Sequence, residues 1–178
     1  AMVWEDWSHK YTGHWKQNRE ISGGGFMFDT GAHMMNTVSD LVGEAFVEVA
    51  AWLDNRNKTI DVIGAVMART ESGILVTMAS CGETIPSIGS DIHVFCTEAT
   101  LRTGVWGEHL EIQKRGEKVL TPIDVPPSMG VWEQFLAVRH GDIENPSPPE
   151  IGLRMAGLWD AIQESAANGG ALIKLNQS

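Results

Sequence analysis

This sequence has few cysteines and a shortage of positive charge. Its 178 residues include two cysteines, and 13 lysine and arginine residues stand against 23 aspartate and glutamate residues, for a formal net charge of −10. Two cysteines cannot build a disulfide framework. We interpret Cys81 and Cys96 as reduced core or strand residues, with a disulfide between them as the alternative. Reduced thiols are typical of cytoplasmic proteins, and we expect that location.

The acidic charge and the lack of long apolar segments argue against two kinds of partner. A strongly negative surface repels a phosphate backbone, so we expect no nucleic acid. A membrane-spanning helix needs about 20 consecutive apolar residues, and no run approaches that length. The first ten residues, AMVWEDWSHK, carry charges where a signal peptide needs an apolar core. We therefore expect no membrane contact.

A dinucleotide fingerprint is also missing. No strand is followed by GxGxxG, the loop that holds a pyrophosphate. We interpret Ala1-Met2 as a tag remnant ahead of an internal start. Residues 1–178 have the length of a single domain. If the function needs a nucleotide-binding domain, that domain lies outside these residues.

The apolar pattern changes period along the chain. Residues 3–22 show no sustained period, and we interpret them as a strand remnant and a loop. Residues 26–42 have helical spacing, which predicts a helix that begins between Gly25 and Asp29 and ends at Gly43. Six β-rich segments follow, joined mostly by short turns, at residues 46–54, 59–70, 73–82, 91–104, 109–116 and 118–125.

The C-terminal part returns to a helical period. Helices are predicted over 131–141 and 151–169, separated by a Pro-rich break at 144–150, and residues 171–175 are predicted to form an edge strand. One helix, then many strands, then helices indicate an α+β fold. We expect a large, mainly antiparallel open sheet with helices on one face.

Three consecutive glycines, Gly23, Gly24 and Gly25, precede the first predicted helix. Glycines at a helix N-terminus can cradle a phosphate. Here no hydrophobic strand precedes them, the spacing is not GxGxxG, and no P-loop lysine follows. We favour a role in backbone freedom or in the close approach of another chain segment.

Asp29 and His33 are four residues apart, which places them on one face of a helix. A carboxylate beside an imidazole fixes its tautomer and suits it to proton transfer. In the alternative, Asp29 caps the helix and His33 is an ordinary first-turn residue. A metal site with His9 and His14 is a further alternative, but the spacing matches no common zinc motif, and we expect no metal.

The segment WKQNREISGGGFMFDTGAHMMN, residues 15–36, resembles the signature of the glucose–fructose oxidoreductase/inositol dehydrogenase/rhizopine catabolism (Gfo/Idh/MocA) family. That family's pattern is close to W-R, a few residues, S-G-G-G, and then D-x-G-x-H-x-x-D. The tail is also similar, through Glu133, Phe135, the Pro-rich break, Gly152 and the stretch 161–175. The resemblance covers nearly the whole chain as the family's C-terminal domain.

The resemblance implies a fold and an activity. Members are NAD(P)-dependent oxidoreductases that act mostly on sugars, cyclitols and related polyols. Their N-terminal Rossmann domain binds NAD or NADP and carries the catalytic lysine. Their C-terminal domain is an open sheet, similar to that of glyceraldehyde-3-phosphate dehydrogenase, which shapes the substrate site and often forms the oligomer interface. We therefore expect this chain's own Rossmann domain and a second copy, as in a dimer, as partners, beside a small-molecule substrate.

The resemblance also assigns residues. Asp29 and His33 stand at the family's catalytic positions, and the substrate-binding positions are Trp15, Lys16, Arg19 and Asn36. Three of these depart from the pattern, because Lys16 replaces the usual Arg, Arg19 a common Pro and Asn36 a frequent Asp. The departures bear on the substrate more than on the reaction. The alternative function is a non-catalytic dimerisation module, or a module that binds a ligand or metal, in which the seven tryptophans serve an interface.

Overall fold

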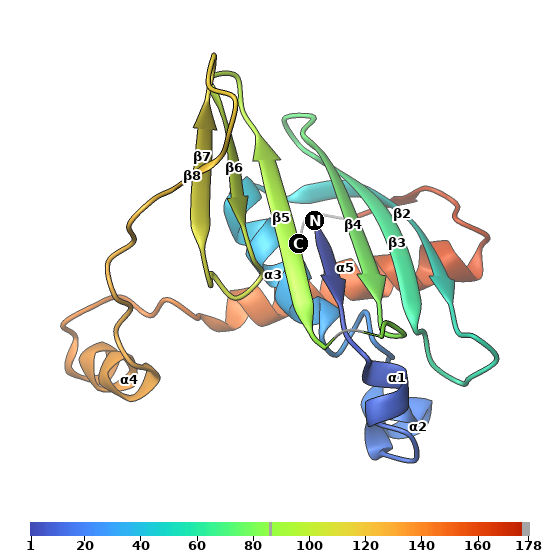
Figure 1. The fold of residues 1–178 in the computed structure, drawn as a ribbon. Coiled ribbons are helices and arrows are strands. Elements are labelled where there is room, and N and C mark those ends of the chain that lie inside the picture. Colours follow the sequence, from blue (N-terminus) through green and yellow to red (C-terminus); the bar gives the residue numbers. More distant parts are fainter. Residues whose placement is uncertain (86, 176–178) are drawn as a thin grey trace.

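A computed structural model describes residues 1–85 and 87–175 of the chain. Within this part, nine strands form one sheet in the order β8-β7-β6-β5-β1-β4-β3-β2-β9 (Figure 1). β1 and β4 run parallel, and the other neighbouring pairs of the described sheet are antiparallel. The strands are β1 (Met2–Trp4), β2 (Phe46–Asp54), β3 (Ile63–Thr70), β4 (Leu75–Cys81), β5 (Gly89–Phe95), β6 (Ala99–Thr103), β7 (Leu110–Lys114), β8 (Thr121–Pro122) and β9 (Ile173–Lys174).

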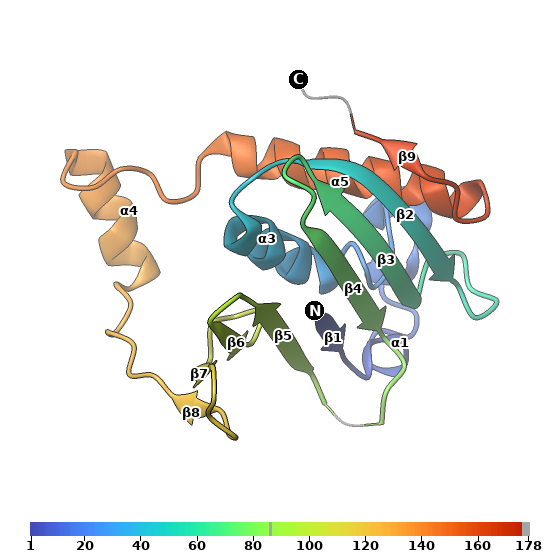
Figure 2. The same cartoon turned by 90° about the horizontal axis from the view of Figure 1, so that it is seen from above.

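The helices take three positions relative to this sheet. α3 and α5 pack against each other and cover one face, whereas α1 and α2 lie beyond one end of β1 (Figures 1 and 2). α4 stands apart from the sheet, and none of its side chains is buried (Figure 2). The helical elements are α1 (Trp7–Lys10), the 3-10 helix η1 (Trp15–Gln17), α2 (Arg19–Ser22), α3 (Gly31–Val42), α4 (Val131–His140) and α5 (Pro149–Ala167).

The two faces of the sheet differ in burial. Along β3, Gly64, Val66 and Ala68 are buried, while the residues between them are exposed. Successive side chains of a strand point to opposite faces, so one face is covered by helices and the other is open. The open face carries several large apolar side chains that the described chain leaves exposed: Trp52, Met67, Leu75 and Phe95.

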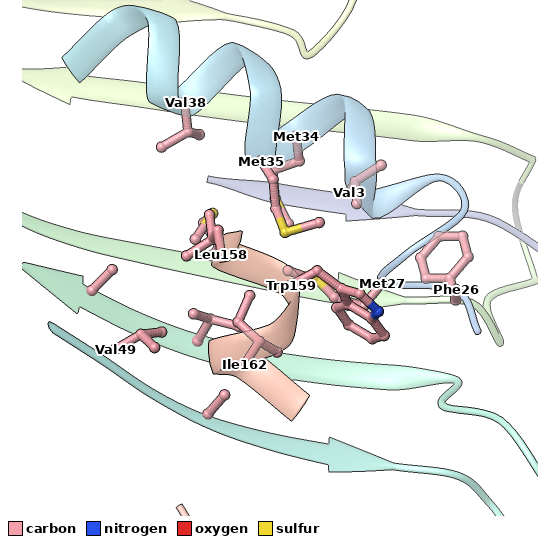
Figure 3. Packing of buried hydrophobic residues seen from close by; sticks show 14 of the residues in the cluster. Val3, Phe26, Met27, Met34, Met35, Val38, Val49, Leu158, Trp159 and Ile162 are labelled. Atoms are coloured by element: carbon pink, nitrogen blue, oxygen red, sulfur yellow. The ribbon is translucent and has the colours of Figure 1, made fainter. Parts of the chain in front are cut away.

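The core fills the space between the covered face and the two packed helices (Figure 3). Each helix buries apolar residues at intervals of three and four, the spacing that keeps them on one side. Burial of a side chain of this size contributes about 1.5–3 kcal/mol. The fully or nearly fully buried contributors are Met34, Met35 and Val38 from α3 and Leu158, Trp159 and Ile162 from α5.

The predicted architecture is confirmed: the sheet is large, open and mainly antiparallel, with the packed helices on one face. A short turn at residues 71–73 joins β3 to β4, as expected for segments joined by short turns. Both C-terminal helices are present, and α5 begins inside the Pro-rich break, at Pro149. Proline fits the first position of a helix because its missing N–H would have no partner there. β9 forms the edge of the sheet beside β2.

Several boundaries differ from the predictions. The segment 91–104 is two strands, β5 and β6, joined by a turn, rather than one. In the segment 3–22, β1 corresponds to the predicted strand remnant, and three short helical elements stand where the loop was predicted. The predicted strand 118–125 is reduced to the two residues of β8. α3 begins at Gly31, later than predicted, because backbone N–H groups of the chain before it donate hydrogen bonds to Asp61, which holds that chain in turns.

Candidate functional site

Asp29 lies in the turn between the glycine run and α3, and two side chains bind it. Trp7 Nε1 donates to Asp29 Oδ2 over 2.7 Å, and Lys16 Nζ donates to the same oxygen over 2.8 Å. Lys16 and Asp29 keep 24% and 30% of their side-chain surface exposed. The Lys16 ammonium also lies 4.6 Å from the centre of the Tyr11 ring, which is within the range of a cation–π contact. The Lys16–Asp29 ion pair is therefore partly exposed, and the buried indole of Trp7 donates a hydrogen bond to its carboxylate.

His33 is exposed on the first turn of α3, near this pair in sequence. Its ring centroid lies 6.0 Å from that of Trp106, which belongs to the turn after β6. The predicted helical face shared by Asp29 and His33 is absent, because Asp29 precedes α3. Within the described residues no hydrogen bond joins the two side chains. Asp29 is therefore bound to a cation, and His33 lies beside an aromatic ring.

The other predicted substrate residues separate into two groups. Trp15 is exposed in η1, next to Lys16, and its ring contacts that of His14. Arg19 and Asn36 both bond to α5 instead: Arg19 Nη2 donates to Gln163 Oε1 over 3.3 Å, and Arg154 Nη2 donates to Asn36 Oδ1 over 3.3 Å. The structure thus brings Lys16 to Asp29, and it gives Arg19 and Asn36 partners on α5.

The three glycines have three different surroundings. Gly23 ends α2 in the left-handed conformation, with φ of 74°. A Cβ on Gly24 would lie 2.7 Å from the Trp159 ring, and a Cβ on Gly25 would lie 1.9 Å from the carbonyl oxygen of Asp61. Another segment therefore approaches the backbone closely at Gly24 and Gly25, and side chains have no room there.

Asp61 is a buried residue that the sequence reasoning missed. It lies just before β3, and its carboxylate accepts hydrogen bonds from Gly25 N over 2.7 Å and from Met27 N over 2.8 Å. Burial raises the pKa of Asp61, and the two backbone N–H groups oppose that rise. The only sequence signal is an acidic residue inside the apolar stretch TIDVIGAV. Asp61 fixes the loop that leads to Asp29.

We next searched residues 1–85 and 87–175 for metal ligands, paired cysteines and membrane-spanning helices. Among the described residues, no three His, Cys, Asp or Glu side chains gather closely enough to hold a metal ion. Cys81 is half-buried and Cys96 exposed, and both are free thiols. In the described part of the chain, no helix combines the length and apolar character that crossing a membrane requires.

Comparison with solved structures shows the same fold in several oxidoreductases. Levoglucosan dehydrogenase in complex with NADH has a TM-score of 0.83 at 17% identity, with 99% of this chain and 57% of that chain covered. Aldose-aldose oxidoreductase from Caulobacter crescentus, complexed with glycerol, has a TM-score of 0.78 at 18% identity, with 98% and 55% covered. The WlbA dehydrogenase from Bordetella pertussis, in complex with NADH and UDP-GlcNAcA, has 0.74 at 21% identity, with 99% and 55% covered.

This chain thus spans little more than half the length of these enzymes. No protein with a curated description matches the sequence. A family model described as the GFO/IDH/MocA C-terminal domain matches residues 1–102, which is more than half of the 178. On this match and this fold, the chain belongs to the GFO/IDH/MocA family and corresponds to its C-terminal domain.

Proposed function

We propose that this chain is the substrate-binding and catalytic half of an NAD(P)-dependent oxidoreductase that acts on a sugar, cyclitol or related polyol. The observation that carries the proposal is the partly exposed Asp29 carboxylate, bound by Lys16 and Trp7 just before the helix that carries His33. Solved relatives of the same fold are complexes with NADH and levoglucosan, or with NADH and L-sorbose, which supports a sugar as the substrate class.

The glycine run does not fit a dinucleotide pyrophosphate. The N–H of Gly25 already donates to Asp61, and Gly24 lies under Phe28 and Trp159. A phosphate would have to replace the Asp61 carboxylate in a buried place. We therefore assign NAD or NADP binding to a Rossmann domain outside these residues, which also determines the choice between the two. The cofactor would supply the hydride acceptor, and this chain would hold the polyol.

The proposed roles follow from which atoms are available. In the described part of the chain, both donors to Asp29 bind Oδ2, which leaves Oδ1 to accept a hydrogen bond from a substrate hydroxyl. The ammonium of Lys16 has three N–H groups, and a substrate oxygen can accept one that Asp29 does not use. Oxidation of a secondary alcohol also releases the hydroxyl proton. We assign acceptance of that proton to His33, whose exposed imidazole can act as a general base.

The test uses the full-length protein. Sugars and inositols are screened with NAD and with NADP, and turnover of the best substrate is compared between the wild type, His33→Ala and the control His140→Ala. His140 is also an exposed histidine, at the end of α4. We expect His33→Ala to lower turnover by at least about 100-fold, the usual contribution of a general base, and His140→Ala to leave it unchanged. Near wild-type turnover in His33→Ala would exclude the proposed role.

A second measurement tests the division of labour between domains. We expect residues 1–178 alone to bind no dinucleotide. A micromolar affinity of this chain for NADH, measured by calorimetry or fluorescence, contradicts the assignment of cofactor binding to another domain.

The open face of the sheet favours a second role, in assembly. Trp52, Met67, Leu75 and Phe95 are exposed on it, and contiguous exposed apolar surface marks interaction sites. We propose that two copies pack through this face. Light scattering distinguishes the outcomes: a strict monomer at high concentration argues against it, and Met67→Lys should weaken the dimer if the face is the interface.

A further inference from the structure

β1 is much shorter than the two strands that flank it. β1 has three residues, whereas β4 and β5 have seven each. The register pairs Met2 with Ala79 of β4 and with Asp91 of β5. The first half of β4 and the last half of β5 therefore extend past Ala1 with no strand between them in the described chain. Because both strands pair with β1, their separation is about twice the strand spacing, about 10 Å, which admits one further strand.

A cavity of about 760 Å³ occupies this gap. We call it the β4–β5 slot. Its walls are the end of β5, from Ile92 to Cys96, and the chain from Ile74 to Thr77. Its floor is the C-terminal half of α3, through Val38, Leu41 and Val42. The floor is apolar, so an inward-facing apolar side chain would complete the core there.

The backbone at Ala1 already follows the pattern of a strand inside the slot. Ala1 N donates to Thr77 O over 2.8 Å, and Ala79 N donates to Ala1 O over 2.9 Å. These are the bonds of a parallel ladder. The amine of Ala1 is partly buried, and burial lowers its pKa. A peptide N–H, which carries no charge, fits this place better than an ammonium.

Alternation along the flanking strands shows which groups face the slot. On β5, Cys96 N donates to Ala99 O, toward β6, so the N–H groups of His93 and Phe95 point the other way, into the slot. On β4 the bonds at Thr77 and Ala79 face β1. Thr77 N also points into the slot, whereas the N–H groups of Val76 and Val94 point to β3 and β6. By this alternation, backbone N–H groups of the described residues point into the slot from both sides.

We propose that the β4–β5 slot is filled by the three residues that directly precede position 1 in the full-length protein, as a continuation of β1. Where Ala1-Met2 is a tag remnant, the protein's own residues stand at positions 1 and 2 of the same strand. Of the three preceding residues, the first before position 1 would pair with Thr77 and His93, the second with Val76 and Val94, and the third with Leu75 and Phe95. The argument for this occupant is continuity, because the ladder at Ala1 leads into the slot without a break. A strand from another chain would have to end against Ala1.

The extension has a side-chain pattern and a consequence. Val3 faces the core, so the second residue before Ala1 faces it too and should be apolar. It would then press on the last turns of the helix whose first turn carries His33. The segment that enters from a preceding domain would in this way help to set the position of α3. This inference does not rest on the proposed reaction.

Amide hydrogen exchange on the full-length protein tests the proposal at single residues. We expect the amides of Thr77, His93 and Phe95 to exchange as slowly as those of Val76 and Val94, at least about 100-fold slower than in an unstructured peptide. Protection of Val76 and Val94 alone would mean an open slot and would overturn the proposal. Protection of the slot amides that rises with protein concentration would assign the slot to another chain and would also overturn it.

A disulfide gives an independent test in the full-length protein with Cys81→Ser and Cys96→Ser. Cysteine replaces Val94 and the second residue before Ala1. These two positions form a non-hydrogen-bonded antiparallel pair, with Cα atoms about 4.5 Å apart, which a disulfide spans. We expect an intramolecular disulfide, seen by mass spectrometry after non-reducing digestion. The control moves the cysteine to the first residue before Ala1, whose side chain points to the open face and should not link. No disulfide, or one between two chains, contradicts the extension.

Discussion

Two carboxylates hold the loop between α2 and α3, and they do so in different ways. Asp61 is buried and accepts hydrogen bonds from two backbone N–H groups, those of Gly25 and Met27. Asp29 is partly exposed and accepts from two side chains, those of Trp7 and Lys16. Backbone donors cannot move without moving the chain, whereas a lysine side chain can exchange partners. The comparison separates a carboxylate that fixes the loop from one that can bind a ligand.

The comparison rests on the close contact at Gly25, and the largest expected effect is there. A Cβ on Gly25 would lie 1.9 Å from the Asp61 carbonyl oxygen, so Gly25→Ala must push two backbones apart. We expect the free energy of unfolding to fall by more than about 3 kcal/mol. Gly152→Ala in α5 is the matched control, because nothing lies within 4 Å of its Cβ. Alanine should raise helix stability there by about 0.5–1 kcal/mol. Urea unfolding measures both, and equal effects contradict the contact.

Removing the Asp61 carboxylate should have the next largest effect. Asp61→Ala leaves two buried N–H groups without an acceptor, and we expect a loss of about 2–3 kcal/mol in the free energy of unfolding. Asp61→Asn keeps one acceptor oxygen but turns an NH₂ group toward the other N–H, so the loss should be about half as large. If Asp61→Ala unfolds at the urea concentration of the wild type, the carboxylate does not hold the loop.

The architecture could be predicted from the sequence, because helices and strands depend on signals within a few neighbouring residues. The β-rich composition of 46–54 and 73–82 predicted strands, and the apolar spacing within 26–42 predicted a helix, with Gly43 as its end. The structure has α3 ending at Val42, with Gly43 in the left-handed conformation. Each of these signals lies within a few residues of the feature that it predicts.

The site was predicted less well, because its contacts join distant segments. Asp61 is 36 residues from Gly25, and no local sequence pattern at either residue indicates that the two are in contact. That contact keeps residues 25–27 out of the helix, which removes the predicted helical face of Asp29 and His33. Trp106 reaches His33 only through the fold. The glycine run marked a place of close backbone contact, and the residues that make this contact come from elsewhere in the chain.

A substitution of Lys16 tests whether Asp29, in contrast to Asp61, belongs to the proposed substrate site. Lys16→Met removes one donor of a partly exposed pair, so the free energy of unfolding should change by less than about 1 kcal/mol. If the proposed function holds, turnover of the best polyol should fall by at least about tenfold, since a hydrogen bond from a charged group contributes about 1.5–3 kcal/mol. Lys10→Met is the control, because Lys10 pairs with Glu5 over 2.8 Å instead. Equal turnover in the two variants would place Lys16 outside the site.

The smallest expected effect is a pH dependence of stability that comes from Asp61. Burial raises its pKa above the ordinary value of 3.8, and the backbone hydrogen bonds limit the rise. The folded protein then keeps this proton at pH values where the unfolded chain has released it. The contribution of this proton to the free energy of unfolding is therefore complete below the unfolded pKa and is lost as pH rises through the folded pKa.

The variant Asp61→Asn has no titrating group at this position and serves as the reference. The unfolding free energy of Asp61→Asn is subtracted from that of the wild type at each pH, which cancels the contribution of the other acidic groups to the pH dependence. We expect the difference to become less favourable to the wild type as pH rises, and to be constant above the folded pKa. A difference that grows in favour of the wild type with pH would mean that the two N–H groups outweigh burial, and that Asp61 is held as a stabilised anion.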